Sequence, residues 1–176
     1  MPRGTRRLIG AAFVLGVAIL GTLTVADEAR ATHLPPGQAT VTRDVDGDTV
    51  DVRIGSRTER VRLLGINTPE TVDPRKPVEC YGHQASARTA QLIPPGTRVR
   101  LERDVEPRDK YGRLLAYIYR VDDGTDVNLT LVAEGDAVVL TIPPNGARVS
   151  QLTAASRAAQ AAGLGLWGVC PSETAR

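Results

Sequence analysis

The 176-residue sequence is poor in aromatic residues, lysine, histidine and cysteine. Six residues are aromatic, and histidine and cysteine occur twice each, which argues against an aromatic base-stacking surface and against a cysteine–histidine metal site. Lys76 and Lys110 are the only lysines among 22 basic residues, so arginine carries nearly all the positive charge. Arginine binds phosphate oxygens through a planar pair of hydrogen bonds, which favours phosphate recognition, although a codon bias would produce the same excess.

The first 31 residues differ in composition from the rest. Basic residues at positions 3, 6 and 7 precede an uncharged apolar run over residues 8–26, and Ala29 and Ala31 form a small-x-small cleavage site. We expect residues 1–31 to be a signal peptide, or an N-terminal membrane anchor if the run is not cleaved, since it is just long enough to span a bilayer. The folded part is therefore expected to be secreted or held at the cell surface, outside the cytoplasm.

Without residues 1–31 the chain has no net charge. Those residues hold four of the 22 basic and two of the 20 acidic residues, which leaves eighteen of each. A protein that binds nucleic acid regardless of sequence usually carries a surplus of positive charge. Any recognition of phosphate here must therefore be local and depend on a few arginines.

Cys80 and Cys170 are the only cysteines. An even number of cysteines in an exported chain is typical of disulfide formation, so we expect these two to pair, with two free thiols as the alternative. The bridge would tie the C-terminal end of the chain to the region that follows the Thr-Pro-Glu turn.

Hydrophobic periodicity predicts one domain over residues 39–170, with a flexible lead-in at 32–38 and a tail at 171–176. Alternating apolar and polar residues indicate strands, and helical spacing with Pro or Gly stops indicates helices. The expected strands cover residues 39–45, 48–54, 59–66, 97–102 and 114–121, and the expected helices cover 79–93, 127–134 and 147–162. Five strands interrupted by a helix favour a small closed Greek-key barrel over a sandwich.

Three polar clusters stand out from these elements: DVDGDT at 44–49, RLLGINTPE at 62–70 and RDKYGR at 108–113. Carboxylates beside a turn supply oxygen ligands for a hard cation such as Ca²⁺. A glutamate can activate a water molecule, and two guanidinium groups can hold a phosphate and the charge that develops on it. Hydrolysis of a phosphodiester requires this combination.

Over residues 39–167 the sequence resembles the thermonuclease family of staphylococcal-nuclease-like enzymes. The resemblance rests on four motifs in the same order: DGDT at 46–49, RLLGINTPE at 62–70, YGHQAS at 81–86 and DKYGRLLAYIY at 109–119. It implies an α+β fold that is mainly a β barrel, an OB-fold barrel of five strands with three helices. It also implies calcium-dependent cleavage of DNA and/or RNA to 3′-phosphate ends.

The resemblance further implies a role for single residues. Glu70 falls at the position of the general base, and Arg62 and Arg113 fall at those of the arginines that stabilise the transition state. Asp48 falls on a calcium-binding carboxylate, and Thr68 on a residue whose backbone carbonyl binds calcium.

Two departures from the family pattern affect these expectations. Asn67 replaces a second ligand aspartate; its amide oxygen still coordinates Ca²⁺ but brings no charge, so we expect weaker metal binding, with Asp46 and Glu70 contributing through water. Residues 138–145 lack the pair of tyrosines that flank the bound nucleotide in the family, so less base stacking is expected. Lys110 and Tyr111 are the remaining candidates for substrate binding.

Two other functions remain open from the sequence. One is a non-catalytic OB-fold module of the cell envelope that binds nucleic acid; few aromatics and a neutral domain argue for chemistry instead. The other is an envelope interaction domain on an uncleaved anchor, which leaves the acid and arginine clusters unexplained. We expect a monomer with DNA and/or RNA as substrate and no obligate protein partner.

Overall fold

The computed structural model describes residues 35–75 and 77–171. The expected signal peptide or anchor at 1–31 lies outside the described residues, as does the tail beyond residue 171. Within the described part of the chain, no helix is both long enough and apolar enough to cross a membrane.

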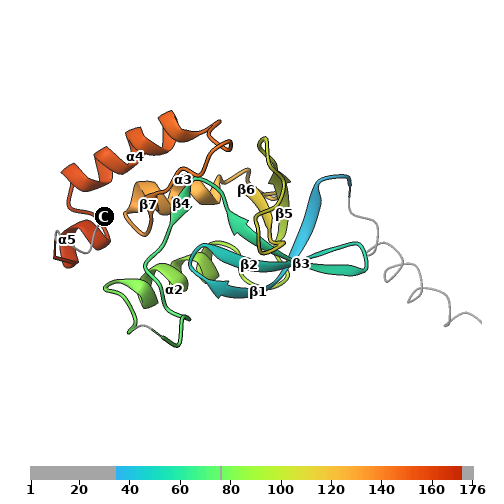
Figure 1. The fold of residues 1–176 in the computed structure, drawn as a ribbon, viewed down its shortest axis with the longest axis horizontal. Coiled ribbons are helices and arrows are strands. Elements are labelled where there is room, and N and C mark those ends of the chain that lie inside the picture. The colour runs from blue at the N-terminus through green and yellow to red at the C-terminus, as the bar shows by residue number, and fades with distance from the viewer. Residues whose placement is uncertain (1–34, 76, 172–176) are drawn as a thin grey trace, which may run out of the picture. The chain divides into compact units, whose positions relative to one another are not determined.

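Five strands close into a barrel in the order β1–β2–β3–β6–β5 (Figure 1). β3 and β6 pair in parallel, and every other neighbouring pair in the barrel is antiparallel. The barrel strands are β1 (Gln38–Asp46), β2 (Thr49–Ile54), β3 (Arg57–Leu63), β5 (Arg98–Glu102) and β6 (Leu114–Arg120). The predicted five-stranded barrel of OB-fold type is confirmed.

Strand alternation builds the core of this barrel. Val50 and Val52 of β2 and Val61 and Leu63 of β3 are all buried, and each pair is separated by one polar residue. Successive side chains of a strand point to opposite faces, so barrel closure gathers these apolar side chains inside and leaves the polar ones outside. The outward row of β3 therefore carries arginines.

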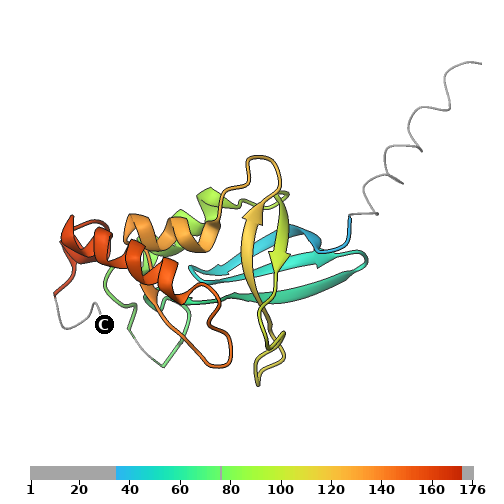
Figure 2. The ribbon, with the colours of Figure 1, turned by 90° about the horizontal axis from the view of Figure 1, so that it is seen from above.

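The helices lie together at one end of the barrel, away from the tip of the β2–β3 hairpin (Figures 1 and 2). They are α2 (Gly82–Leu92), α3 (Val127–Glu134), α4 (Val149–Ala161) and the one-turn α5 (Leu166–Val169). The first three confirm the predicted helices, and α5 was not predicted. Asn128 of α3 is fully buried and donates to the carbonyl of Leu64, while its own oxygen accepts from the Ile118 N–H. This side chain fastens the helical end to the barrel.

The predicted third strand is too long. It ends at Leu63 rather than at residue 66 because Gly65 adopts a positive φ of 76°, which turns the chain. A Cβ at Gly65 would lie 2.5 Å from the Leu152 side chain, so a larger residue would also have to displace that buried leucine. After the turn, β4 (Ile66–Asn67) pairs with β7 (Val138–Val139) in a separate two-stranded sheet. The break redirects the polar segment that follows.

Helix α2 begins three residues later than predicted. Tyr81 has a φ of 68°, in the left-handed region, so the helix cannot continue backwards through it.

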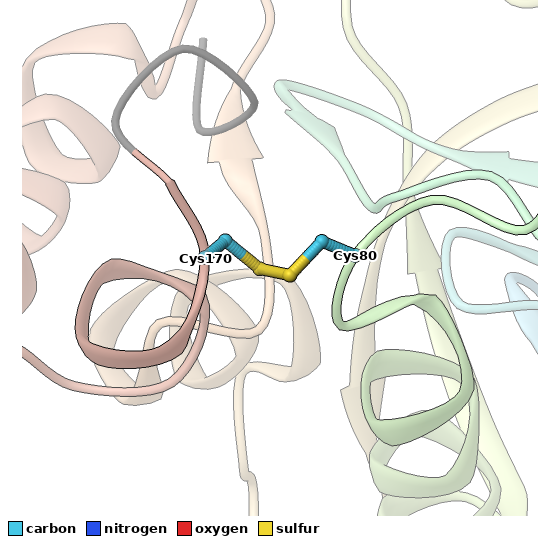
Figure 3. Close-up of a disulfide and its surroundings, with 2 residues drawn as sticks. All are labelled: Cys80 and Cys170. Carbon is cyan, nitrogen blue, oxygen red and sulfur yellow. A yellow bond between two sulfur atoms is a disulfide. The ribbon is translucent and has the colours of Figure 1, made fainter.

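The residue before Tyr81, Cys80, forms a disulfide with Cys170, as predicted from the cysteine count (Figure 3). The bridge joins the start of α2 to the end of α5 across 90 residues of sequence. A loop of this length contributes about 4–5 kcal/mol in the chain-entropy model.

Asp136, which follows α3, provides a pH-dependent element of stability. It is 5% exposed, and burial raises the pKa of its carboxyl from 3.8 to about 6; the nearby Tyr81 hydroxyl opposes this rise and Glu134 adds to it. A raised folded-state pKa means that the fold is more stable with the proton bound. The contribution of Asp136 is present in full below pH 3.8 and is lost as the pH rises through about 6.

We therefore expect Asp136→Asn, which is neutral at every pH, to raise the melting temperature at pH 8 by about 2–6 °C. The difference from the wild type should disappear at pH 4, where the native carboxyl is also neutral in the fold. Thermal unfolding at both pH values checks this, with Asp122→Asn on an exposed loop as the control. An equal effect of Asp136→Asn at the two pH values would show that burial does not govern this titration.

Candidate active site

The three polar clusters meet at one cleft of about 860 Å³. Its walls come from the β1–β2 turn, the end of β3 with residues 64–72, the β5–β6 loop and residues 138–145. All eight side chains that the sequence singled out for chemistry or binding line it: Asp48, Arg62, Asn67, Thr68, Glu70, Lys110, Tyr111 and Arg113. These residues lie up to 65 positions apart in the sequence, so barrel closure brings them together.

The β1–β2 turn packs directly against the Thr-Pro turn. A Cβ at Gly47 would lie 2.7 Å from the Thr68 hydroxyl, so this close approach requires glycine. The Thr68 N–H donates to Asp48 Oδ2 at 3.1 Å, and the Leu63 N–H donates to the Asp48 carbonyl at 2.9 Å. Asp48 is thereby fixed between the end of β3 and the segment that carries Glu70.

Arg62 is held by acceptors on both sides of the break at Gly65. Its Nη2 lies 2.9 Å from Asp48 Oδ2 and donates to Asn67 Oδ1 at 3.0 Å. Its Nη1 donates to the carbonyls of Leu63 and Ile66 at 2.7 and 2.9 Å. The side chain is 12% exposed, and this burial lowers the pKa of the guanidinium, which nevertheless stays charged. A buried cation with a single fixed orientation results.

Glu70 accepts hydrogen bonds from its own turn. The N–H groups of Val72 and Asp73 donate to Glu70 Oε1 at 2.7 and 3.1 Å. Burial acts to raise the pKa of Glu70, but these backbone donors outweigh it and hold that pKa below its ordinary value. The pKa of the neighbouring Asp46 is shifted in the opposite direction, because burial raises it. Glu70 is therefore a carboxylate at neutral pH, in the form that accepts a proton.

Arg113 is less confined than Arg62. Its Nε donates to Asp109 Oδ2 at 2.6 Å, and its two terminal nitrogens have no hydrogen-bond partner among the described residues. Tyr111 is 72% exposed beside it, with Lys110 Nζ 5.0 Å and Arg113 Cζ 5.5 Å from the ring centroid. This loop offers free donors and an aromatic face at the mouth of the cleft.

The cleft contains oxygen atoms of the kind that bind a hard cation. Asp46, Asp48 and Thr68 present oxygen atoms, and the buried Thr68 hydroxyl has no hydrogen-bond partner within the described residues. The Asn67 amide turns its oxygen to Arg62 and donates through Nδ2 to the Thr68 carbonyl at 3.2 Å. Across residues 35–75 and 77–171, no three Asp, Glu, His or Cys side chains are grouped as a metal site. Carbonyl, amide and water oxygens would have to complete the shell, as Ca²⁺ permits.

Among the cleft residues that sequence reasoning did not single out, three bear on ligand binding. Leu140 and Ile142 line the wall built by residues 138–145 and are 38% and 63% exposed, so aliphatic side chains occupy this wall. Arg60 also lines the cleft, two residues before Arg62 on β3. Strand alternation was the available signal, because it places residues 60 and 62 on the same face.

The fold and the cleft together define an OB-barrel protein with an acid–arginine site suited to phosphate anions. A family model described as "Staphylococcal nuclease homologue" matches residues 60–169. The thermonuclease of Staphylococcus intermedius is 43% identical over 127 residues, which cover 72% of this chain and 74% of that protein. This chain therefore belongs to the staphylococcal nuclease family, and the family resemblance seen in the motifs is confirmed.

Two proteins of Bacillus subtilis (strain 168) are also similar to it. The SPbeta prophage-derived endonuclease YokF is 42% identical and the endonuclease YncB 40% identical, each over 130 residues and 73% of this chain. The aligned region covers 43% of YokF and 60% of YncB, so this chain spans only part of those relatives.

Proposed function

We propose that this protein is a thermonuclease-type nuclease that hydrolyses phosphodiester bonds of DNA and/or RNA and leaves 3′-phosphate ends. The observation that carries the proposal is the meeting of Glu70 with two guanidinium groups, those of Arg62 and Arg113, in one cleft. Membership of the staphylococcal nuclease family, whose similar proteins are named thermonucleases and endonucleases, supports the same activity.

In the proposed reaction Glu70 accepts a proton from a water molecule as the water oxygen attacks phosphorus. The bond from phosphorus to the 5′-oxygen breaks, and that oxygen takes a proton from solvent. Arg62 and Arg113 stabilise the negative charge that builds on the phosphoryl oxygens. Arg62 is already fixed by four protein acceptors. The terminal nitrogens of Arg113 have no partner within residues 35–75 and 77–171, so they would be able to follow the substrate.

We propose Ca²⁺ as the cofactor, held by Asp48, the Thr68 carbonyl and the Asn67 amide oxygen after that amide turns away from Arg62. When bound, the cation would polarise the phosphoryl group and offset its charge. Asp48 Oδ2 contacts Arg62 and accepts from the Thr68 N–H, so this carboxylate would bring its negative charge to the ligand set beside both residues.

We expect Asn67→Asp to lower the calcium concentration that gives half-maximal cleavage, because ligand charge sets Ca²⁺ affinity in oxygen sites. The added carboxylate also repels Asp46 and Asp48 in the metal-free protein. The variant should therefore gain more melting temperature on calcium addition than the wild type does. Calcium titrations of the cleavage rate and of the melting temperature check both effects. An unchanged calcium midpoint would remove position 67 from the ligand set.

We also propose that the protein is exported. The apolar run and the Ala-x-Ala site at its N-terminus support this, and so does the Cys80–Cys170 disulfide, because such bonds persist in oxidising compartments. Cell fractionation and the N-terminal sequence of the recovered protein test export and cleavage separately. Recovery of the uncut chain from the cytoplasm would end the proposal.

The purified full chain, incubated with plasmid DNA or RNA in calcium or in chelator, tests the nuclease proposal. Fragments should form only in calcium, and phosphatase treatment of them should release phosphate from 3′ ends. Binding of the nucleic acid without cleavage would instead identify the protein as a non-catalytic OB-fold binder.

A further inference from the structure

Strand β3 carries a second arginine beside the one in the cleft. Thr58, Arg60 and Arg62 alternate with Glu59 and Val61, so the three share the outward face of the strand. Residues two apart on a strand are separated by about 6.5–7 Å. Neighbouring phosphates along a nucleic-acid strand have a comparable separation, so Arg60 stands one phosphate away from Arg62.

The cleft continues past Arg60 into an adjoining groove. This groove has a volume of about 470 Å³ and is lined by Asp51, Thr58, Arg60, Tyr111, Gly112 and Arg113. Arg60, Tyr111 and Arg113 line both hollows, so a chain lying in the cleft can pass between them into the groove. The three shared residues place the two hollows next to each other.

The ion-paired cluster of Arg43, Asp51 and Arg60 beside the groove has an excess of positive charge. Asp51 lies opposite Arg60 in the β2–β3 register and opposite Arg43 in the β1–β2 register. Its carboxylate accepts from Arg60 Nε at 2.8 Å and from Arg43 Nη2 at 2.6 Å. Two guanidinium groups thus share one carboxylate, which leaves one positive charge uncompensated.

Arg60 is oriented by Asp51 and is still able to bind an anion. Its Nε and Nη2 face the Asp51 carboxylate, while its Nη1 has no hydrogen-bond partner among the described residues. The side chain is 46% exposed. Asp51 therefore fixes the guanidinium plane and leaves one edge for a ligand in the groove.

We propose that Arg60 binds the phosphate next to the one that is cleaved, and that the substrate strand runs from the cleft past Tyr111 into this groove. The inference rests on the proposed nuclease function and adds to it a binding position outside the cleaved bond. The aliphatic cleft wall formed by Leu140 and Ile142 offers no aromatic ring for stacking, so phosphate contacts carry more of the affinity.

The test measures binding separately from cleavage, in full-length protein carrying Glu70→Gln. Fluorescence anisotropy with labelled single-stranded oligonucleotides gives the affinity at several salt concentrations. Adding Arg60→Gln should weaken binding about tenfold and reduce the slope of log K against log salt by about 0.7, the loss of one phosphate contact. Arg98→Gln is the matched control, because Arg98 is also exposed and paired with an aspartate, Asp122, but lines neither hollow. It should leave affinity and slope unchanged.

A scan of the oligonucleotide locates the contact. Single phosphates are replaced by neutral methylphosphonates, one position at a time on either side of the cleaved bond. In protein with Arg60, the methylphosphonate at one flanking position should weaken binding about tenfold. In protein with Arg60→Gln, the same methylphosphonate should have no further effect. Arg60→Lys, which keeps the charge without the planar fork, should restore part of the affinity.

The outcomes separate this inference from the proposed function. Equal affinity and equal salt slope with and without Arg60→Gln, or additive effects of Arg60→Gln and every methylphosphonate, would overturn the Arg60 contact even if the wild type cleaves nucleic acid. Failure of the wild type to cleave would reject the nuclease proposal. The binding data would still show whether Arg60 contacts a phosphate. The melting temperature of each variant shows whether it is folded, and the scan on protein with native Arg60 does not depend on any variant at that position.

Discussion

Replacing Glu70 by Gln is expected to lower kcat about 10²- to 10⁴-fold, the range that general-base catalysis contributes. Glutamine keeps the size of the side chain, and its oxygen still accepts from the N–H groups of Val72 and Asp73, so the turn should survive. What it loses is the ability to take a proton from water. Steady-state cleavage of an oligonucleotide in saturating calcium, together with the melting temperature, measures both parts of the expectation.

Glu106→Gln is the control for this change, because Glu106 also lines the cleft and is exposed but has no proposed role. It should retain the wild-type rate. A Glu70→Gln protein that keeps more than half of that rate would end the assignment of Glu70 as the base.

Replacing Arg62 by Lys is expected to lower kcat by about 10²-fold, more than it changes KM, because the flexible ammonium loses the fixed position of the positive charge that would stabilise the transition state. Stability should fall as well. An ammonium cannot reach all four acceptors that now surround the guanidinium, which include Asp48 and Asn67. Acceptors left unpaired in a buried place cost free energy.

Arg113→Lys separates the loss of turnover from the loss of stability. Arg113 makes its side-chain hydrogen bond to Asp109 alone among the described residues and is more exposed than Arg62, so this variant should lose turnover with little change in melting temperature. Steady-state kinetics and thermal unfolding of both variants make the comparison. A raised KM with unchanged kcat in either variant would assign that arginine to substrate binding instead of transition-state stabilisation.

Arg62 and Arg113 differ in burial and in hydrogen bonding, which fits different roles in the proposed mechanism. Arg62 is buried, and its three hydrogen bonds and its ion pair with Asp48 reach acceptors on both sides of the Gly65 turn. In the proposed mechanism it would contribute a charge whose position is set before substrate arrives. Arg113 and Tyr111 lie on the β5–β6 loop, where the Arg113 terminal nitrogens are unpaired among the described residues and the Tyr111 ring is exposed. In the proposed mechanism both could adjust to the bound strand. Preorganised charge is the more effective form of electrostatic catalysis, because it needs no rearrangement during the reaction.

Local sequence patterns were sufficient to predict the barrel, the three longer helices, the disulfide and the kinds of side chain in the cleft. Alternation in residues 48–54 and the stop at Pro94 and Pro95 are local patterns, and a short window of sequence is enough to read them. The motifs around Arg62, Glu70 and Arg113 likewise predicted which side chains line the cleft, because each carries its residue types at fixed spacing.

Tertiary structure alone decided how those side chains are used. The apolar run of the third strand continues through Leu64 to Ile66, and only the folded chain shows that Gly65 adopts a positive φ. The strand ends there, and Asn67 is redirected into pairing with β7. The orientation of the Asn67 amide and the groove at Arg60 depend on hydrogen bonds and strand register between segments distant in sequence. Periodicity reports which face of an element a residue occupies, whereas its partners across the fold are set by closure of the barrel.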